Sequence, residues 1–191
     1  STITGTAYLT ASIGAIADYE TVLFTAGPPV SMTLLAVPST VAANGAATSV
    51  ITATVFDLFG RRVVDGTPVT LTTTIGSFGS GPSRTVVTTG GVATAPLTST
   101  VAGVATVSGV SGAASASIPV TFTAGPPFTI TLQADPASIR GDGVATTTIE
   151  ATVLDQFSNC VADGIAVTFQ TSLGAITPSG LTQGCVARAT L

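Results

Sequence analysis

The sequence Phe24-Thr25-Ala26-Gly27-Pro28-Pro29 occurs a second time, without change, at residues 122–127. The two copies lie 98 residues apart, counted from the glycine of one copy to the glycine of the other (125 − 27). A period of this length is close to the size of one small domain, and an internal repeat decides how the rest of a chain is interpreted. The 191 residues therefore correspond to about two domain equivalents.

The composition is that of a β protein. Hydrophobic residues make up 45% of the chain and charged residues only 7%. The polar remainder is mostly Thr, Ser and Gly, which favour strands and turns. The chain contains no His and no Lys and has a formal net charge of −4, so we expect no nucleic-acid partner, no metal site and no cofactor.

From the sequence we expect neither a membrane-spanning nor a signal segment. No apolar run approaches the roughly 20 residues that a membrane span needs. The residues from Ser1 onward have neither a charged start nor an apolar signal core. We therefore expect a mature chain, soluble or assembled, without a membrane span.

Apolar residues alternate with polar ones through residues 28–125, and a period of two is the mark of strands with one buried side. Seven short strands in about 100 residues are typical of a two-sheet sandwich of immunoglobulin (Ig) type. The predicted fold class is therefore all-β. The residues expected to mark the seven strands are Met32, Leu34 and Ala36; Ile51, Ala53 and Val55; Val69 and Leu71; Arg84 to Thr88; Ala93, Ala95 and Leu97; Ala105 and Val107; and Ile118, Val120 and Phe122.

The two ends of the chain are partial copies of this sandwich. Residues 126–191 repeat its first five strands and residues 1–27 repeat its last two, which predicts one complete domain at 28–125 and two complementary partial domains. One match is poor, because Glu20 stands where Ile118 faces inward. We therefore expect Glu20 to lie at a strand end.

The alignment of the ends predicts a head-to-tail arrangement. Leu191 corresponds to Leu97 and Ser1 to Ser99, so joining them continues the repeat with one position missing. We expect residues 126–191 to be completed by residues 1–27 of a neighbouring unit, with Ser1 and Leu191 at the inter-unit junction. Two versions remain open: the units are joined covalently in one giant repeat protein, or each is a separate chain that donates strands to the next.

Several short motifs point to a known family. They are Val55-Phe56-Asp57, Asp65-Gly66, Val69-Thr70-Leu71, Gly91-Val92-Ala93-Thr94 and residues 102–107, with Val153-Leu154-Asp155, Asp163-Gly164 and Val167-Thr168-Phe169 in the second copy. With these motifs the chain resembles the bacterial immunoglobulin-like tandem repeats of the invasin and intimin adhesins, over essentially its whole length. The resemblance implies an extracellular tandem stalk, and it implies no receptor-binding residues, because in that family those belong to specialised terminal domains.

The two cysteines are expected to form a disulfide. Cys160 follows the second strand of its copy and Cys185 opens the fifth. These strands are antiparallel neighbours in an Ig-type sandwich, so the two Cα atoms approach the distance that a disulfide needs. The middle copy has Arg62 and Gly91 at these places. Two free buried thiols are the alternative; a disulfide indicates an oxidising, extracellular setting.

Four aspartates flank equivalent turns in the two copies: Asp57 and Asp65, and Asp155 and Asp163. Paired carboxylates near a turn can bind calcium, but the dense ligand run of a calcium loop is missing here. Asp also caps turns by bonding its own following backbone, and this is the interpretation we prefer. Without His or Lys, the usual nucleophile and base pairs are absent, so we expect no catalytic residues and no enzyme.

The repeated motif itself is expected to be an inter-domain linker, made of Ala26, Gly27, Pro28 and Pro29 and of Ala124, Gly125, Pro126 and Pro127. Prolines fix φ and remove donors, so such a linker is short, extended and stiff. The function we predict is a structural repeat of an extracellular filament or adhesin stalk at the cell surface. Its partners would be copies of itself and a host or neighbouring-cell surface.

The alternative function is a carbohydrate-binding or spacer module of a secreted enzyme or surface protein. Such a module shows a row of exposed aromatic side chains for stacking on sugar rings. Tyr8 and Tyr19 are too few and too scattered along the sequence to predict one.

Overall fold

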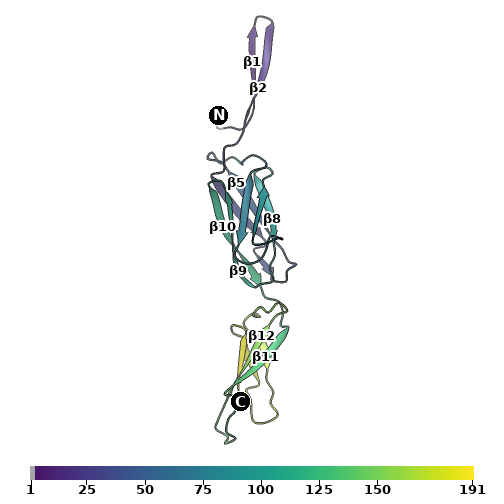
Figure 1. Cartoon of the computed structure of the whole chain (residues 1–191), viewed down its shortest axis with the longest axis vertical. Helices are drawn as coiled ribbons and strands as arrows, with labels where there is room; N and C mark the ends of the chain where they lie inside the picture. The colour runs from purple at the N-terminus through teal and green to yellow at the C-terminus, as the bar shows by residue number, and fades with distance from the viewer. Residues whose placement is uncertain (1–2) are drawn as a thin grey trace. The chain divides into compact units, whose positions relative to one another are not determined.

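The computed structural model describes residues 3–191, and the regular elements in this part of the chain are all strands (Figure 1). They form one five-stranded sheet, two three-stranded sheets and two two-stranded sheets. Two compact units are distinguishable: one holds β1–β3, β5–β8 and residues 106–119, and the other holds β4, residues 98–105 and residues 120–191. The domain boundaries expected at residues 27 and 125 stay predictions.

The first sheet of the middle repeat is antiparallel throughout. Its order is β3–β5–β8, with β5 in the centre. Leu34 of β3 lies opposite Ala53 of β5, and Ala53 lies opposite Ala93 of β8. The predicted pairing of the second and fifth strands is therefore confirmed. The bounds are β3 (Ser31–Val37), β5 (Ser49–Phe56) and β8 (Val92–Leu97).

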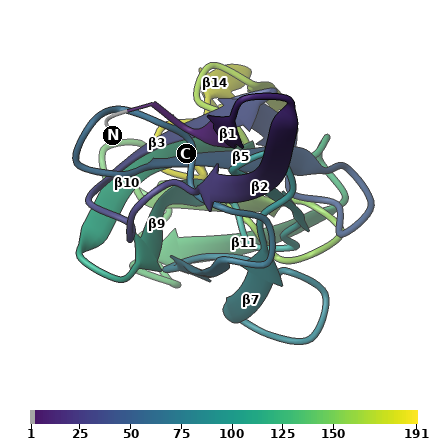
Figure 2. The same ribbon diagram turned by 90° about the horizontal axis from the view of Figure 1, so that it is seen from above.

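The second sheet has five strands in the order β4–β10–β9–β6–β7. β6 pairs antiparallel with both β7 and β9, whereas β10 pairs in parallel with β4. β7 forms a free edge of this sheet, as Figure 2 shows. The bounds are β4 (Thr40–Ala42), β6 (Pro68–Thr73), β7 (Ser83–Val87), β9 (Gly103–Ser111) and β10 (Ala114–Thr123).

The two sheets face each other closely at Gly109 of β9. A Cβ atom at this position would lie 2.9 Å from Sδ of Met32 and 3.2 Å from Cδ2 of Leu34, both on β3. A glycine allows this approach of backbone to side chain without displacing either side chain. The all-β, Ig-like fold is confirmed. Its buried residues include Ile51, Ala53, Val55, Val69, Leu71, Ala93, Ala95, Leu97, Ala105, Val107, Val120 and Phe122.

One strand was not predicted. The chain leaves the first sheet after Val37, passes Pro38, and pairs again as β4 in the other sheet. Proline cannot donate to a ladder, so it ends β3 and allows the crossing. Val41 of β4 then lies opposite Phe122 of β10, and both side chains are buried.

Near the N-terminus, β1 (Gly5–Ile13) and β2 (Ile16–Phe24) form a two-stranded antiparallel hairpin that pairs with no other strand of the described chain (Figure 1). Gly14, with φ of 58°, lies in its turn, as Gly112 does between β9 and β10 with φ of 55°. Glu20 lies inside β2, opposite Leu9. The expectation that Glu20 ends a strand is therefore wrong: the ladder continues to Phe24 because both strands are long enough to pair there.

Residues 126–191 form two small sheets. The larger has the order β11–β12–β15 and repeats the first sheet of the middle repeat, while β13 pairs with β14. Their bounds are β11 (Thr129–Asp135), β12 (Thr148–Leu154), β13 (Ala166–Thr168), β14 (Ser179–Leu181) and β15 (Val186–Thr190). Their core consists of Ala151, Val153, Val161, Val167, Phe169, Ala187 and Ala189.

Candidate interaction site

The β1–β2 hairpin exposes side chains of a kind that the middle repeat buries. Every residue of β2 is exposed, and only Ala7 of β1 is half-buried. Ile13 and Ile16 keep 79% and 73% of their surface exposed. Their counterparts 98 residues later, Ser111 and Ala114, are buried. The hairpin face that repeats the inner face of β9 and β10 consists of Ala7, Leu9, Ala11, Ile13, Ile16, Asp18, Glu20, Val22 and Phe24.

In residues 126–191, the apolar side chains of β11 on the matching face of the sheet are exposed, whereas those of β12 and β15 are buried. Ile130 is 55% exposed, although its counterpart Met32 is only 8% exposed. Leu132 is likewise exposed, and Phe169 is buried at the edge of the same surface. These side chains line an open cavity of about 400 Å³, together with Ile149 and other residues. We call this surface the open groove.

Two segments beside the open groove lack strand structure that the middle repeat has. Residues 138–140 correspond to β4 but are not in a strand. β13 ends at Thr168, whereas its counterpart β6 continues for three residues beyond Thr70 and pairs with β9 there. In the middle repeat these segments pair with β10 and β9. Residues 126–191 contain no counterpart of β9 or β10. The two segments therefore have no neighbouring strand in this part of the chain with which to pair.

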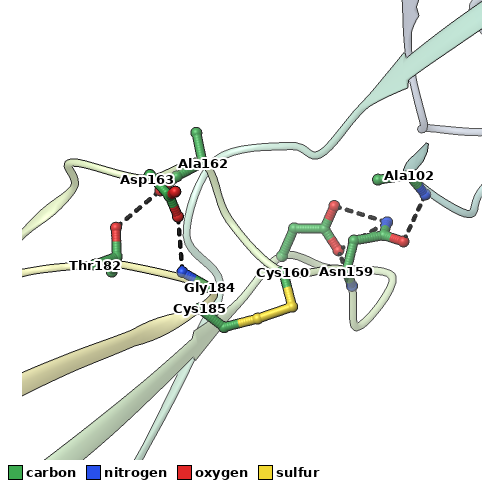
Figure 3. Close-up of a disulfide and its surroundings, with 9 residues drawn as sticks. Ala102, Asn159, Cys160, Ala162, Asp163, Thr182, Gly184 and Cys185 are labelled. Atoms are coloured by element: carbon green, nitrogen blue, oxygen red, sulfur yellow. Dashed lines mark hydrogen bonds between the residues drawn. A yellow bond between two sulfur atoms is a disulfide. The ribbon is translucent and has the colours of Figure 1, made fainter. Parts of the chain in front are cut away.

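Cys160 and Cys185 are joined by a disulfide, with their Cα atoms 4.8 Å apart (Figure 3). Cys160 forms an isolated bridge with Leu154, the last residue of β12, and Cys185 directly precedes β15. Cys185 has φ of 75°, and its counterpart Gly91 has φ of 73°. A Cβ at Gly91 would lie 2.5 Å from Cβ of Arg62, so the middle repeat needs glycine where the last repeat has a cysteine.

Asp57 and Asp155 tie each linker to the turn of the domain that follows it. Oδ2 of Asp57 accepts hydrogen bonds from the Gly27 amide at 2.9 Å and from Nε of Arg61 at 2.8 Å. Oδ2 of Asp155 accepts a hydrogen bond from the Gly125 amide at the same 2.9 Å. Both carboxylates are buried. The sequence predicted these residues as turn caps only, without the contact to the linker.

The hydrogen bonds shift the pKa of these carboxyl groups. The Arg61 side chain is the main cause that holds the pKa of Asp57 well below its usual range; burial opposes it, and backbone amides add to the lowering. For Asp155, burial raises the pKa, but the hydrogen bonds from Asn159, Gly125 and Phe157 outweigh it, and the pKa is lowered. Both groups are therefore ionised in the folded protein at neutral pH.

We expect the midpoint of thermal unfolding to fall by several degrees as the pH drops below about 4. In this range Asp57 becomes protonated in the unfolded chain but stays ionised in the folded protein. A lowered folded-state pKa contributes stability above the unfolded pKa and loses it as the pH falls toward the folded value. Calorimetry between neutral pH and about pH 2.5 would measure the drop. An Asp57→Asn variant should show a smaller drop, and an equal drop would refute the assignment to Asp57.

Asp65 and Asp163, the other two of the four aspartates that flank the equivalent turns, also accept backbone hydrogen bonds. Oδ1 of Asp65 accepts a hydrogen bond from the Gly90 amide at 2.6 Å, and Oδ1 of Asp163 accepts one from the Gly184 amide at 2.8 Å (Figure 3). These bonds join the turn to the start of the fifth strand. Residues 3–191 contain no group of three or more His, Cys, Asp or Glu side chains that could hold a metal ion. The same residues include no helix of the length and hydropathy that membrane crossing requires.

Asn159 is a further contact residue that sequence reasoning missed. Its Nδ2 donates to the Thr100 carbonyl at 2.9 Å, and its Oδ1 accepts from the Ala102 amide at 2.8 Å (Figure 3). Nδ2 of Asn159 also donates a hydrogen bond to Oδ2 of Asp155. The only signal in the sequence was that Asn159 replaces Arg61 at the same turn position.

The predicted junction residues are placed in part. Ser1 lies outside the described residues. Leu191 exchanges two backbone hydrogen bonds with Thr147, at 2.8 Å and 3.0 Å. Its side chain lines two cavities of residues 126–191. In the first linker, Pro29 lies close to Gly112: a Cβ atom added to Gly112 would be 3.5 Å from Cβ of Pro29.

The tyrosines are not scattered in space. Tyr8 lies opposite Thr21 and Tyr19 lies opposite Thr10, so both tyrosines share one face of the hairpin as diagonal neighbours. Both are highly exposed. Their counterparts, Thr106 and Ser117, are exposed on the outer face of the middle repeat. This pair was not predicted, because the register of the hairpin was not known from the sequence.

The repeat, the two facing sheets and the strand order together define a protein of tandem Ig-like sandwiches. Residues 31–123 match the family model described as bacterial Ig-like domain, group 1. The middle repeat is therefore similar to bacterial Ig-like domains, and the resemblance to the invasin and intimin repeats is confirmed. No curated protein matches the sequence.

Three solved structures show how far the similarity reaches. The chain is similar to invasin, described as a bacterial integrin-binding protein, at 25% identity and a TM-score of 0.64. It is similar to the Escherichia coli adhesin FdeC at 18% identity and 0.57, and to InvD of Yersinia pseudotuberculosis at 25% and 0.57. The alignments cover 98%, 99% and 83% of this chain but only 40%, 65% and 48% of the three structures, respectively. The chain thus spans less than two thirds of the length of each of these structures.

Proposed function

We propose that this chain is a structural repeat of an extracellular filament or adhesin stalk, whose units join head to tail. The β1–β2 hairpin of one unit completes the sandwich that residues 126–191 leave open in the next. One observation carries this proposal. The hairpin and the open groove both expose apolar side chains, and the middle repeat buries the residues at most of the corresponding positions, as Phe24 with Phe122 and Ile130 with Met32 illustrate.

The energetics favour such a joining. An isolated two-stranded hairpin is marginally stable in water, because its backbone pairs on one side only and it has no core. Seating it in the groove would bury apolar side chains on both partners and extend both sheets by main-chain hydrogen bonds. Strand addition of this kind gives affinity through the backbone and specificity through alternate side chains.

The linkers are proposed to hold consecutive repeats in a set orientation, as a stalk requires. Three features support this: the two prolines of each Ala-Gly-Pro-Pro motif, the buried aspartate that binds each linker glycine, and the contact of Asn159 with residues 100–102. The disulfide of Cys160 and Cys185 supports an extracellular or cell-surface location. The far partner is proposed to be a host or neighbouring-cell surface. No catalysis is part of this function.

Self-association tests the proposal directly. We expect sedimentation of the oxidised chain, from about 1 µM to about 100 µM, to give species in successive multiples of 18.6 kDa. A chain that sediments at 18.6 kDa over this whole range would contradict head-to-tail joining. The intact mass of the native material, denatured and reduced, then separates a covalent tandem array from separate subunits.

A carbohydrate-binding module is the second candidate, and the pairing of Tyr8 with Tyr19 on one exposed hairpin face favours it. Aromatic pairs of this kind stack on sugar rings. Binding to a glycan array that is lost in a Tyr8→Ala, Tyr19→Ala variant would support this function. An array on which the native chain and the variant both fail to bind would remove it.

A further inference from the structure

We propose that Phe24 of one copy is the anchor of the joint and enters the cavity beside Ile139 of another copy. Strand β2 would then pair in parallel with residues 138–140 of that copy, and β1 would pair antiparallel with residues 168–171. This inference rests on the proposed function and adds to it the register of the joint and the residue on which its affinity depends.

The middle repeat supplies the template for the parallel pair. Phe122 of β10 lies opposite Val41 of β4, and the two are 1% and 8% exposed. The pair is fixed by the backbone, since the Ala43 amide donates to the Thr123 carbonyl at 2.8 Å. Phe122 is among the largest fully buried side chains of the described chain.

The equivalent place in residues 126–191 is empty of any such side chain. Ile139 stands 98 residues after Val41 and lines a cavity of about 660 Å³. Leu173 and Leu191 line the same cavity. Phe24, 98 residues before Phe122, is 37% exposed. Phe24 is thus the counterpart of Phe122, and Ile139 is the counterpart of Val41. If the joint repeats the pairing of the middle repeat, Phe24 lies opposite Ile139.

The antiparallel pair follows in the same way. In the middle repeat, Leu71 of β6 lies opposite Gly109 of β9, and Thr72 lies opposite Ser108. The corresponding pairs across the joint are Phe169 with Ala11 and Gln170 with Thr10. Leu9 and Ala11 then point into the open groove.

Three substitutions in the hairpin test whether it fits. Ala11 stands at the position of Gly109 and carries a Cβ atom. In the middle repeat the atom nearest to a Cβ at Gly109 would be Sδ of Met32. The last repeat has Ile130 in place of Met32, so this sulfur atom is absent from the joint. Asp18 and Glu20 stand where Ala116 and Ile118 are only half-buried. Both carboxylates therefore reach water at the rim of the groove.

Two adjacent residues of β2 give the test. Phe24→Ala should weaken self-association by about 100-fold, because a buried aromatic anchor is lost. Leu23→Ala should change it by less than about threefold, although Leu23 is more exposed than Phe24, because it faces away from the groove. Equal effects of the two substitutions, or a larger effect of Leu23→Ala, would overturn the anchor.

Cross-linking tests the register independently of stability. A Thr10→Cys, Gln170→Cys variant should form a ladder of disulfide-linked multimers on a non-reducing gel. A Thr10→Cys, Ala166→Cys variant is the control, since Ala166 lies four positions away and should not cross-link. If the native chain forms no multimers, the proposed function fails. If multimers form but cross-link through Ala166→Cys instead, only the register and anchor fail.

Discussion

Replacing Phe122 by alanine is expected to lower the free energy of unfolding by about 4 kcal/mol. The side chain is 1% exposed, on β10 beside Val41. Removing it forfeits both the transfer of an aromatic ring out of water and the packing around the cavity left behind. Urea denaturation, monitored by circular dichroism, would measure the change.

Phe59→Ala is the matched control for this prediction. Phe59 lies in the turn after β5 and is exposed, with the guanidinium carbon of Arg61 5.1 Å from the centre of its ring. Its loss should cost about 1 kcal/mol or less. A Phe122→Ala variant no less stable than Phe59→Ala would mean that the two sheets do not enclose Phe122.

Loss of the disulfide between Cys160 and Cys185 is expected to cost about 3 kcal/mol in the unfolding of residues 126–191. The bond closes a loop over a sequence separation of 25 residues and so restricts the unfolded chain. Denaturation with and without reductant would measure this difference. The middle repeat has no cysteine and serves as an internal reference.

Two cysteine-free variants separate the bond from the backbone. Cys160→Arg with Cys185→Gly restores the residues of the middle repeat, including glycine at a φ of 75°. Cys160→Ser with Cys185→Ser keeps a side chain at that left-handed position, and should be less stable by about 1 kcal/mol. Reductant should affect neither variant. If the native chain is equally insensitive, the disulfide does not stabilise the fold.

Much of the fold could be predicted because the repeat constrains it twice. The alternation in Ile51, Ala53 and Val55 fixes which side of β5 is buried, and the same positions recur in β12. The two cysteines could be paired because β5 and β8 are neighbours in this topology. In each case a local pattern and a known strand order pointed to the same answer.

The parts that sequence reasoning missed depend on contacts between distant residues. The hydrogen bond from Gly27 to Asp57 spans 30 residues, and only its recurrence from Gly125 to Asp155 could have revealed it. The crossing of β4 into the second sheet is set by its parallel pairing with β10. Glu20 was misplaced because a charged residue is tolerated inside this strand, where even its counterpart Ile118 is only half-buried.

The central claim is that the hairpin of one copy completes the sandwich of another, and hydrogen–deuterium exchange of the chain at low and high concentration tests it most directly. On assembly, the amides of residues 138–140, of residues 169–171 and of the outer side of the β1–β2 hairpin should become protected together, because all of them enter strand ladders. Exchange that is unchanged in these three segments while multimers form, or protection confined to the free edge strand β7, would contradict it.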